Sequence, residues 1–367
     1  MRISWNNIRK WLIPTLIVFS GALFLITIIS AYGGYFNPAE WTIPAIGVLF
    51  FPYFAMATMA VAVLWLISRH YVMGCIGIAA LLACGPTFIN AMPLRFWYNS
   101  PESEHTFKMI TFNTLHLRDS RFPDSDFNRA LHFLIHSDAD FICMQELYGL
   151  GEPEIPEKFN AQIDSLIQVY PYYSVDWSRE VEFVSKYPFE YIEIQLGLDT
   201  KYGSCAAYKM NINGHPLTVV NVHLPSYLLS PEERNIITEA GTEKGLRDTL
   251  REFEESIFIK MKNAFIMRAG VSEAVAEFAD SQEGNVIVCG DFNDVPGSWT
   301  YRNFTKKGFA DAYAQTGFGH LITYNEHFMF FHIDQILYRG DLVPLYVKKD
   351  RLDSSDHYPL IAEFEFL

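Results

Sequence analysis

The residues most able to do chemistry are polar side chains placed directly after short apolar runs. Val286–Cys289 is such a run; it stops at Gly290 and is followed by Asp291 and Asn293. Because side chains alternate along a strand, Asp291 and Asn293 are expected on the same side of the chain. A carboxylate beside a carboxamide suits a hard cation, a phosphate or an attacking water. The simpler alternative is a turn that closes the strand, because these residue types are common in turns.

Other apolar segments of the chain end in the same way. The polar residues at these ends are Asn113, Glu146, Asn221 with His223, Asp334, and Asp356 with His357. Taken singly, His223 could be a structural histidine and Asp356 could cap a turn. An acid inside an apolar strand, as Asp334 would be in Met329–Leu337, is costly unless it is paired. Together these ends are best explained by strands of a layered sheet whose ends meet at one rim.

The elements that would position these residues are mainly strands. The predicted strands are 108–113, 141–144, 183–189 (a strand and turn), 204–210, 217–223, 286–289, 329–337 and a closing strand after His357. Asn213-Gly214 predicts a hairpin between the fourth and the fifth. Helical spacing predicts a helix from Phe127 to Ile135, and the charged segment Ser230–Gln282 is expected to form helices that cover the sheet.

The first hundred residues have a different composition. Three apolar runs, at about 11–30, 41–66 and 72–92, carry no charge except at their flanks. Each is close to the roughly 20 residues that cross a bilayer core. We therefore predict a membrane anchor of three transmembrane helices in residues 1–100, followed by a catalytic domain in 101–367. A cleaved signal peptide is the alternative for the first run, and a transporter is disfavoured because no ionisable residue interrupts the runs.

Basic residues near the spans predict the orientation. Arg2, Arg9 and Lys10 precede the first run, the loop 31–40 has no base, and Arg69 lies in the second loop. Basic flanks stay in the cytoplasm. Three crossings then place the catalytic domain on the extracytoplasmic side of the cell (inner) membrane. The lipid bilayer is the expected partner of the helices, and no protein partner is predicted.

Charge is concentrated in the second part of the chain. Residues 1–100 hold five of the 28 bases and one of the 42 acids, which leaves 23 bases and 41 acids, a net charge of −18, for 101–367. Such a domain repels phosphate backbones at long range, so a nonspecific nucleic-acid binder is disfavoured.

The motifs, taken in order, resemble those of the endonuclease/exonuclease/phosphatase superfamily of metal-dependent phosphoesterases. The matching pieces are TFN at 111–113, QE at 145–146, SKYP at 185–188, NVHL at 221–224, GDFND at 290–294, IDQIL at 333–337 and SDHYP at 355–359. The resemblance covers roughly 105–367. It implies an α/β (α+β) fold, a four-layer α/β sandwich with two packed, mostly antiparallel sheets and an active site at one edge.

The resemblance also implies roles for individual residues. Glu146 would be the main ligand of Mg²⁺ or Mn²⁺, with Asn113 close by, and Asp356 would serve a second or shifted metal. Asp291 and Asn293 would position or deprotonate the attacking water and hold the phosphate, and His223 would donate to a nonbridging oxygen. Asp334 would orient His357. Whether Asp291 or His357 is the base stays open.

Two positions depart from the family pattern. Residues 179–183 lack the glycine-rich run of many relatives, and Gln335 stands where the family usually has a histidine. We therefore expect a membrane-tethered, divalent-metal-dependent phosphoesterase that cleaves a phosphodiester or phosphomonoester by in-line attack of water. The substrate could be a lipid headgroup, a nucleotide or nucleic acid. The alternatives are an endo- or exonuclease acting on extracytoplasmic nucleic acid and a catalytically silent, membrane-anchored binding module.

Overall fold

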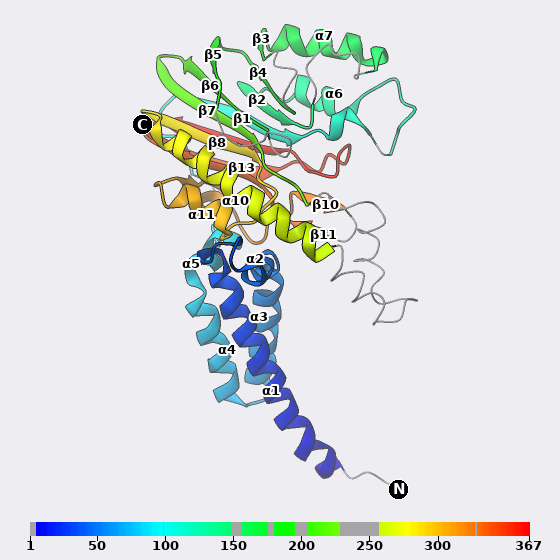
Figure 1. The fold of residues 1–367 in the computed structure, drawn as a ribbon, viewed down its shortest axis with the longest axis vertical. Coiled ribbons are helices and arrows are strands. Elements are labelled where there is room, and N and C mark those ends of the chain that lie inside the picture. Colours follow the sequence, from blue (N-terminus) through cyan, green and yellow to red (C-terminus); the bar gives the residue numbers. More distant parts are fainter. Residues whose placement is uncertain are drawn as a thin grey trace.

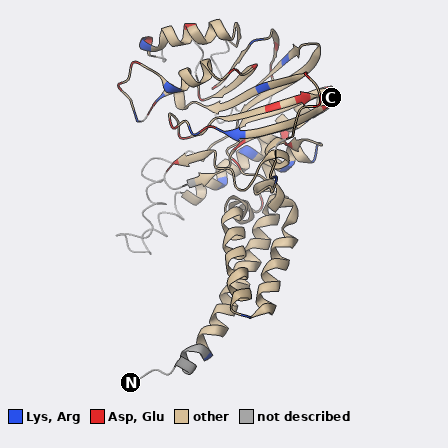
Figure 2. Ribbon diagram, turned by 180° about the vertical axis from the view of Figure 1, so that it is seen from behind, with Lys and Arg blue, Asp and Glu red and all other residues tan. Residues whose placement is uncertain are grey.

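The computed structural model describes residues 5–97, 99–119, 121–147, 156–174, 180–194, 204–227, 257–326 and 329–367. A bundle of apolar helices near the N-terminus supports a β-sandwich formed by the rest of the chain (Figure 1). The charged residues gather on the sandwich, while the bundle carries almost none (Figure 2). Residues 230–256 of the predicted helical segment lie outside the described part.

The bundle contains one continuous apolar helix and two bent helix pairs. Its helices are α1 (Trp5–Tyr32), α2 (Thr42–Leu49), α3 (Phe51–Ile67), α4 (Tyr71–Ala83) and α5 (Gly85–Ala91), with a 3-10 turn η1 at Gly33–Tyr35. Lys10–Tyr35 is long and apolar enough to cross a membrane. The pair α2–α3 bends by 62° and α4–α5 by 73°, so the described part offers one span, or up to three if each bent pair forms one.

Two six-stranded sheets form the sandwich. The first has the order β13 (Leu342–Lys349), β14 (Leu360–Phe366), β1 (Thr106–Asn113), β2 (Phe141–Gln145), β4 (Val181–Ser185) and β3 (Tyr172–Tyr173). The second has the order β5 (Phe189–Ile192), β6 (Ser204–Ile212), β7 (His215–His223), β8 (Asn285–Asp291), β12 (Asp334–Arg339) and β9 (Ala310–Asp311). All pairs are antiparallel except β1–β2 and β7–β8. The expected mostly antiparallel pair of sheets is confirmed.

Helices cover the outer face of each sheet and complete four layers. On the first sheet lie α6 (Arg129–Ile135) and α7 (Asn160–Val169), and on the second lie α10 (Phe258–Ser281) and α11 (Trp299–Thr305). Phe107, Phe141 and Tyr208 belong to the core between the sheets. The described part of the predicted helical segment, α10, covers the second sheet as expected: its Val275 and Ala279 pack with Val222 and Val288.

The two parallel strand pairs decide where the polar strand ends meet. Asn113 is paired with Gln145 in the first sheet, and His223 with Asp291 in the second. Parallel neighbours end on the same side, so each sheet presents two carboxyl ends at one edge. Gln145 Nε2 donates to Asn221 Oδ1 across the sandwich at 2.6 Å, and this contact brings the two edges together.

One predicted strand was wrong. Met329–Leu337 is not a single strand interrupted by an acid; β11 (Met329–Phe331) pairs with β10 (Tyr324–Glu326) in a separate hairpin, and Asp334 is the first residue of β12. Its register partner is Asp291. The chain leaves one sheet and enters another here, which a continuous apolar run does not reveal.

The outer end of the bundle packs directly against the sandwich. Val48 and Leu49 of α2 share a buried core with Val295, Phe331 and Ile333. The backbones also approach closely, because a Cβ added at Gly34 would lie 1.8 Å from Gly297 O. Val295 and Ile333 are near neighbours in sequence of Asn293 and Asp334, so the helical bundle touches the loops that carry predicted site residues.

Candidate active site

Asp291, at the end of β8, is the centre of the predicted site. Its side chain lies on the inner face of the sheet, as do those of Cys289 and Ile287, two and four residues earlier. Gly290 has φ of +137°, and a Cβ there would lie 2.0 Å from Val222 O on the neighbouring strand. Only glycine allows this close approach, so Gly290 lets β8 stay paired up to the point where Asp291 enters the site.

An inner group joins Asp291 to Asp334 and His357. His357 Nδ1 is hydrogen-bonded to Asp334 Oδ2 at 2.8 Å, and its Nε2 lies 3.6 Å from Asp291 Oδ2. All three side chains are buried. Burial lowers the pKa of His357, but the charges of Asp334 and Asp291 outweigh it and raise that pKa well above its ordinary value. The structure thus contains the hydrogen bond through which Asp334 is expected to orient His357.

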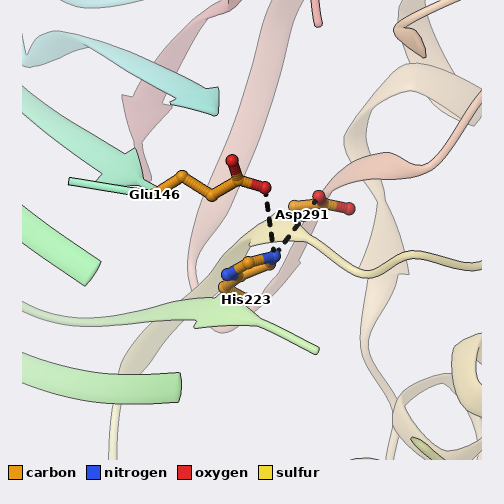
Figure 3. A group of neighbouring side chains, drawn as sticks. All are labelled: Glu146, His223 and Asp291. Carbon is orange, nitrogen blue, oxygen red and sulfur yellow. Dashed lines mark ion pairs between the residues drawn. The ribbon is translucent and has the colours of Figure 1, made fainter. Parts of the chain in front are cut away.

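An outer group joins Asp291 to Glu146 and His223 (Figure 3). His223 Nε2 lies 3.7 Å from Glu146 Oε1 and 3.8 Å from Asp291 Oδ2. Glu146 follows β2 with φ of +51° and keeps about a quarter of its side chain exposed, at 23%. This group is open on one side, and its pairs are longer than hydrogen bonds.

Two asparagines hold the carboxylates in place. Asn113 Nδ2 donates to Glu146 Oε1 at 3.0 Å and to Asp291 Oδ2 at 3.1 Å, so one amide bridges the two acids. Asn293 donates its backbone N–H to Asp291 Oδ1 at 2.8 Å, and its Nδ2 donates to Leu224 O at 2.9 Å. Of the eight predicted site residues, seven thus lie together at one edge.

The eighth, Asp356, lies beside this cluster rather than in it. Its carboxylate accepts from Ser355 Oγ at 3.3 Å, and it is not among the described acids and histidines close enough to share a cation. Asn221 also lies elsewhere: its Nδ2 donates to Met144 O and Glu182 O between the sheets. Gln335 is buried and donates to Asp294 O and His332 O, which ties two loops together.

Three residues near the site were not predicted from the sequence. His116 Nε2 lies 3.8 Å from Glu146 Oε2, and Glu180 Oε2 lies 3.5 Å from His223 Nδ1. Burial lowers the pKa of His223, but Glu180, Asp291 and Glu146 raise it overall. Arg268 of α10 is fully buried; its Nε donates to Pro225 O at 2.9 Å, and its Nη1 lies 3.6 Å from Asp294.

These three residues differ in the signal they leave. Glu180 directly precedes β4. An acid at the start of an apolar strand is a signal like that of the acids at strand ends, and it could have identified Glu180 as a candidate site residue. His116 and Arg268 lie in a turn and in a helix, and their sequence neighbours give no comparable signal.

The donor set of the outer group fits a divalent cation. One ligand atom each from Glu146, His223 and Asp291 lies within 4.8 Å of the others, and carboxylate oxygens are the preferred donors of hard cations. Burial is the main cause of the raised pKa of Asp291, a cost to its charged form that a cation would offset. In the inner group, His357 and Asp334 already satisfy each other, so the outer group is the better cation site.

The family model for the Endonuclease/Exonuclease/phosphatase family matches residues 110–357. The chain belongs to this family. The match spans more than half of the chain and runs from β1 to His357, the stretch that contains every member of both groups. Family members are metal-dependent hydrolases of phosphoester bonds, and this chain is an enzyme of that class.

Solved structures with a similar fold are distant in sequence. The endonuclease/exonuclease/phosphatase from Beutenbergia cavernae is 12% identical with a TM-score of 0.48, and the match covers 72% of each chain. Truncated TDP2 from Caenorhabditis elegans is 18% identical (TM-score 0.45; 71% of this chain, 97% of that one). Beta toxin from Staphylococcus aureus is also 18% identical (TM-score 0.45; 70% and 99%). A comparison with curated proteins gave no match.

Proposed function

We propose that this chain is a membrane-tethered phosphoesterase that uses Mg²⁺ or Mn²⁺ to hydrolyse a small phosphodiester or phosphomonoester by in-line attack of water. The observation that carries the proposal is the position of Asp291, which belongs both to the inner group with Asp334 and His357 and to the outer group with Glu146 and His223. The Asp291 carboxylate thus faces His357 on one side and the proposed cation site on the other.

The proposed roles follow from the contacts of each side chain. Glu146 and Asp291 would hold the cation, which supplies positive charge against the phosphate oxygens when bound. Asp334 fixes the Nδ1 side of His357, so Nε2 faces Asp291. The facing pair Asp291 and His357 can take the proton from the attacking water. His223, whose pKa is raised, can donate a hydrogen bond to a nonbridging phosphate oxygen.

Asn113 and Asn293 would keep this geometry rigid. Both donate to Asp291, and such bonds limit the rotation of a carboxylate that must meet the water in line. Asp356 lies outside both groups. We therefore propose for it a supporting role beside His357, whose pKa it helps to raise.

The apolar bundle supports the membrane part of the proposal. We propose that residues 1–100 anchor the enzyme in the cell membrane with the catalytic domain, 101–367, on the extracytoplasmic side. The apolar helix Lys10–Tyr35 and the two bent pairs support the anchor, and the basic flanks support the orientation. A tethered domain with a net charge of −18 favours small phosphoesters or lipid headgroups over duplex nucleic acid.

The test of the reaction uses the full chain in detergent. Bis-p-nitrophenyl phosphate and p-nitrophenyl phosphate are assayed with Mg²⁺ or Mn²⁺, beside His223→Ala, Asp291→Ala and the control Asp164→Ala on the exposed side of α7. Metal-dependent turnover that is lost in the first two variants and kept in the control is expected. A folded wild-type protein that neither turns over these esters nor binds Mn²⁺ in calorimetry would instead indicate the silent module.

Two further measurements test substrate class and orientation. Strong metal-dependent nicking of plasmid, without activity on lipid or small esters, would favour the nuclease alternative.

A C-terminal alkaline phosphatase fusion should be active if the catalytic domain is extracytoplasmic. An inactive fusion, together with an active cytoplasmic reporter at the same position, would reverse the proposed orientation.

A further inference from the structure

A pocket of about 910 Å³ opens beside the outer group. Its lining includes Leu115, His116, Arg118, Phe122, Phe127 and Lys158. The pocket reaches the site through His116, whose Nε2 is 3.8 Å from Glu146 Oε2. A molecule bound at Glu146 would therefore have this space next to it.

The turn Leu115–Leu117 directs the His116 side chain toward Glu146. Leu115, His116 and Leu117 have φ values of +48°, +55° and +56°, a left-handed turn of three residues other than glycine. Such a turn is unfavourable for residues other than glycine and persists only where its surroundings hold it. Here His116 N donates to Glu146 O at 2.8 Å. The strained turn thus places the His116 imidazole between the pocket and Glu146.

The wall of the pocket is held by a partly buried ion network. Arg129 holds Asp119 through two hydrogen bonds of 2.6 and 2.8 Å and Asp353 through one of 2.7 Å. Its guanidinium also lies 4.8 Å from the ring centre of Phe122. Asp353 belongs to the loop that leads to His357. The aromatic wall and the catalytic loop are therefore tied to one arginine.

The pocket combines exposed aromatic surface with positive charge. Phe122 and Phe127 are 55% and 48% exposed and both line the pocket, and ligand pockets are lined largely by apolar and aromatic side chains. Arg118 and Lys158 are exposed bases in a domain of net charge −18. The acid in the lining, Asp119, is already paired with Arg129. The lining thus presents flat apolar faces together with bases.

We propose that this pocket receives the organic arm of the phosphoester, and that the preferred arm carries an aromatic or flat apolar group and a second negative charge. The proposal rests on the proposed function. Phe122 and Phe127 would contact the flat group, Arg118 and Lys158 would attract the second charge, and His116 would face the scissile phosphate from the pocket side.

Three esters that release the same p-nitrophenolate test the proposal with the full chain in detergent. They are methyl p-nitrophenyl phosphate, thymidine 5′-(p-nitrophenyl phosphate) and its 3′-phosphorylated form. All three share the p-nitrophenyl group, so any difference comes from the other arm, which becomes a thymidine with a flat base in the second ester and gains a second negative charge in the third. We expect kcat/KM to rise about tenfold at each step. Equal values for all three esters would overturn the proposal.

Matched variants assign each gain to its residues. Arg118→Ala and Lys158→Ala should abolish most of the gain from the 3′-phosphate while keeping turnover of the methyl ester, whereas Lys209→Ala, an exposed lysine of β6, should change neither. Phe122→Ala should abolish the gain from the thymidine arm, with the similarly exposed Phe318→Ala as control. Gains that persist in the pocket variants would contradict the assignment.

A binding measurement keeps this test separate from that of the proposed function. Calorimetry with thymidine 3′,5′-bisphosphate should show a Kd about tenfold higher for Arg118→Ala than for Lys209→Ala. This difference in Kd is expected even if none of the esters is turned over. Absence of turnover would contradict the proposed hydrolysis but not the proposed pocket. Equal binding by the two variants would overturn the pocket proposal, whatever the turnover.

Discussion

The two groups that share Asp291 differ in how complete they are. In the inner group, His357 and Asp334 are buried and joined by a 2.8 Å hydrogen bond. In the outer group, the distances from His223 Nε2 to Glu146 and Asp291 are 3.7 and 3.8 Å, and Glu146 is partly exposed. In the inner group the side chains satisfy one another by hydrogen bonding. In the outer group His223 is too far from Glu146 and Asp291 for hydrogen bonds, which leaves space for a ligand. This difference supports the proposal that the inner group moves the proton and the outer group holds the cation and the phosphate.

The largest effect is expected where the two groups meet. Asp291→Asn keeps the shape of the side chain but removes its charge from both groups. We expect kcat/KM to fall by about a thousandfold or more, because the cation site and the proton acceptor are damaged together. The measurement is turnover of the preferred p-nitrophenyl ester, with Asp164→Asn on α7 as control. A loss below tenfold would show that the two groups do not depend on Asp291.

A smaller effect should be confined to the inner group. Asp334→Asn should lower kcat by about a hundredfold, because the amide cannot fix His357 in the same way. Mn²⁺ binding, measured by calorimetry, should change little. If Mn²⁺ affinity fell as much as kcat did, the separation of the two groups would be lost.

The converse effect should be confined to the outer group. Glu146→Gln should raise the Mn²⁺ Kd by at least about tenfold, since it removes the charge of an oxygen ligand. Part of kcat should return at high Mn²⁺ concentration, because the inner group is intact. An unchanged Kd would place the cation elsewhere.

The smallest effect concerns the pH dependence of the metal-free protein. The pKa of His357 is raised in the folded state above its ordinary value of 6.5. Its contribution to stability is therefore fully present below about pH 6.5 and is lost as the pH rises through the folded pKa. With EDTA, the free energy of unfolding should fall above pH 6.5 by up to about 1.4 kcal/mol per pH unit.

The variant His357→Gln tests the source of this slope by denaturant unfolding at several pH values. It should show a shallower slope, and the remainder would come from His223, whose pKa is raised in the same direction. Equal slopes in the two proteins would rule out His357 as the source.

Much of the site could be predicted because its signals are local. Asn113, His223 and Asp291 each end an apolar strand, and alternation places them on the inner face next to residues such as Met109 and Cys289. Family motifs in the right order then fixed the two-sheet fold. The position of Asp334 at the start of β12, instead of inside a strand, was not predictable, because His332-Ile333 looks like strand sequence and only pairing decides where a strand begins.

The sequence by itself determined most of the strand ends that carry site residues, the family and the apolar bundle, because these depend on residue types and spacing along the chain. Only the tertiary structure decided that His116 and Glu180 join the site, that Asp356 lies beside it, and that α2 packs beneath the site loops. These facts depend on how two sheets and a helical bundle pack against one another. Residues that are distant in sequence meet there, and neither periodicity nor composition records which ones.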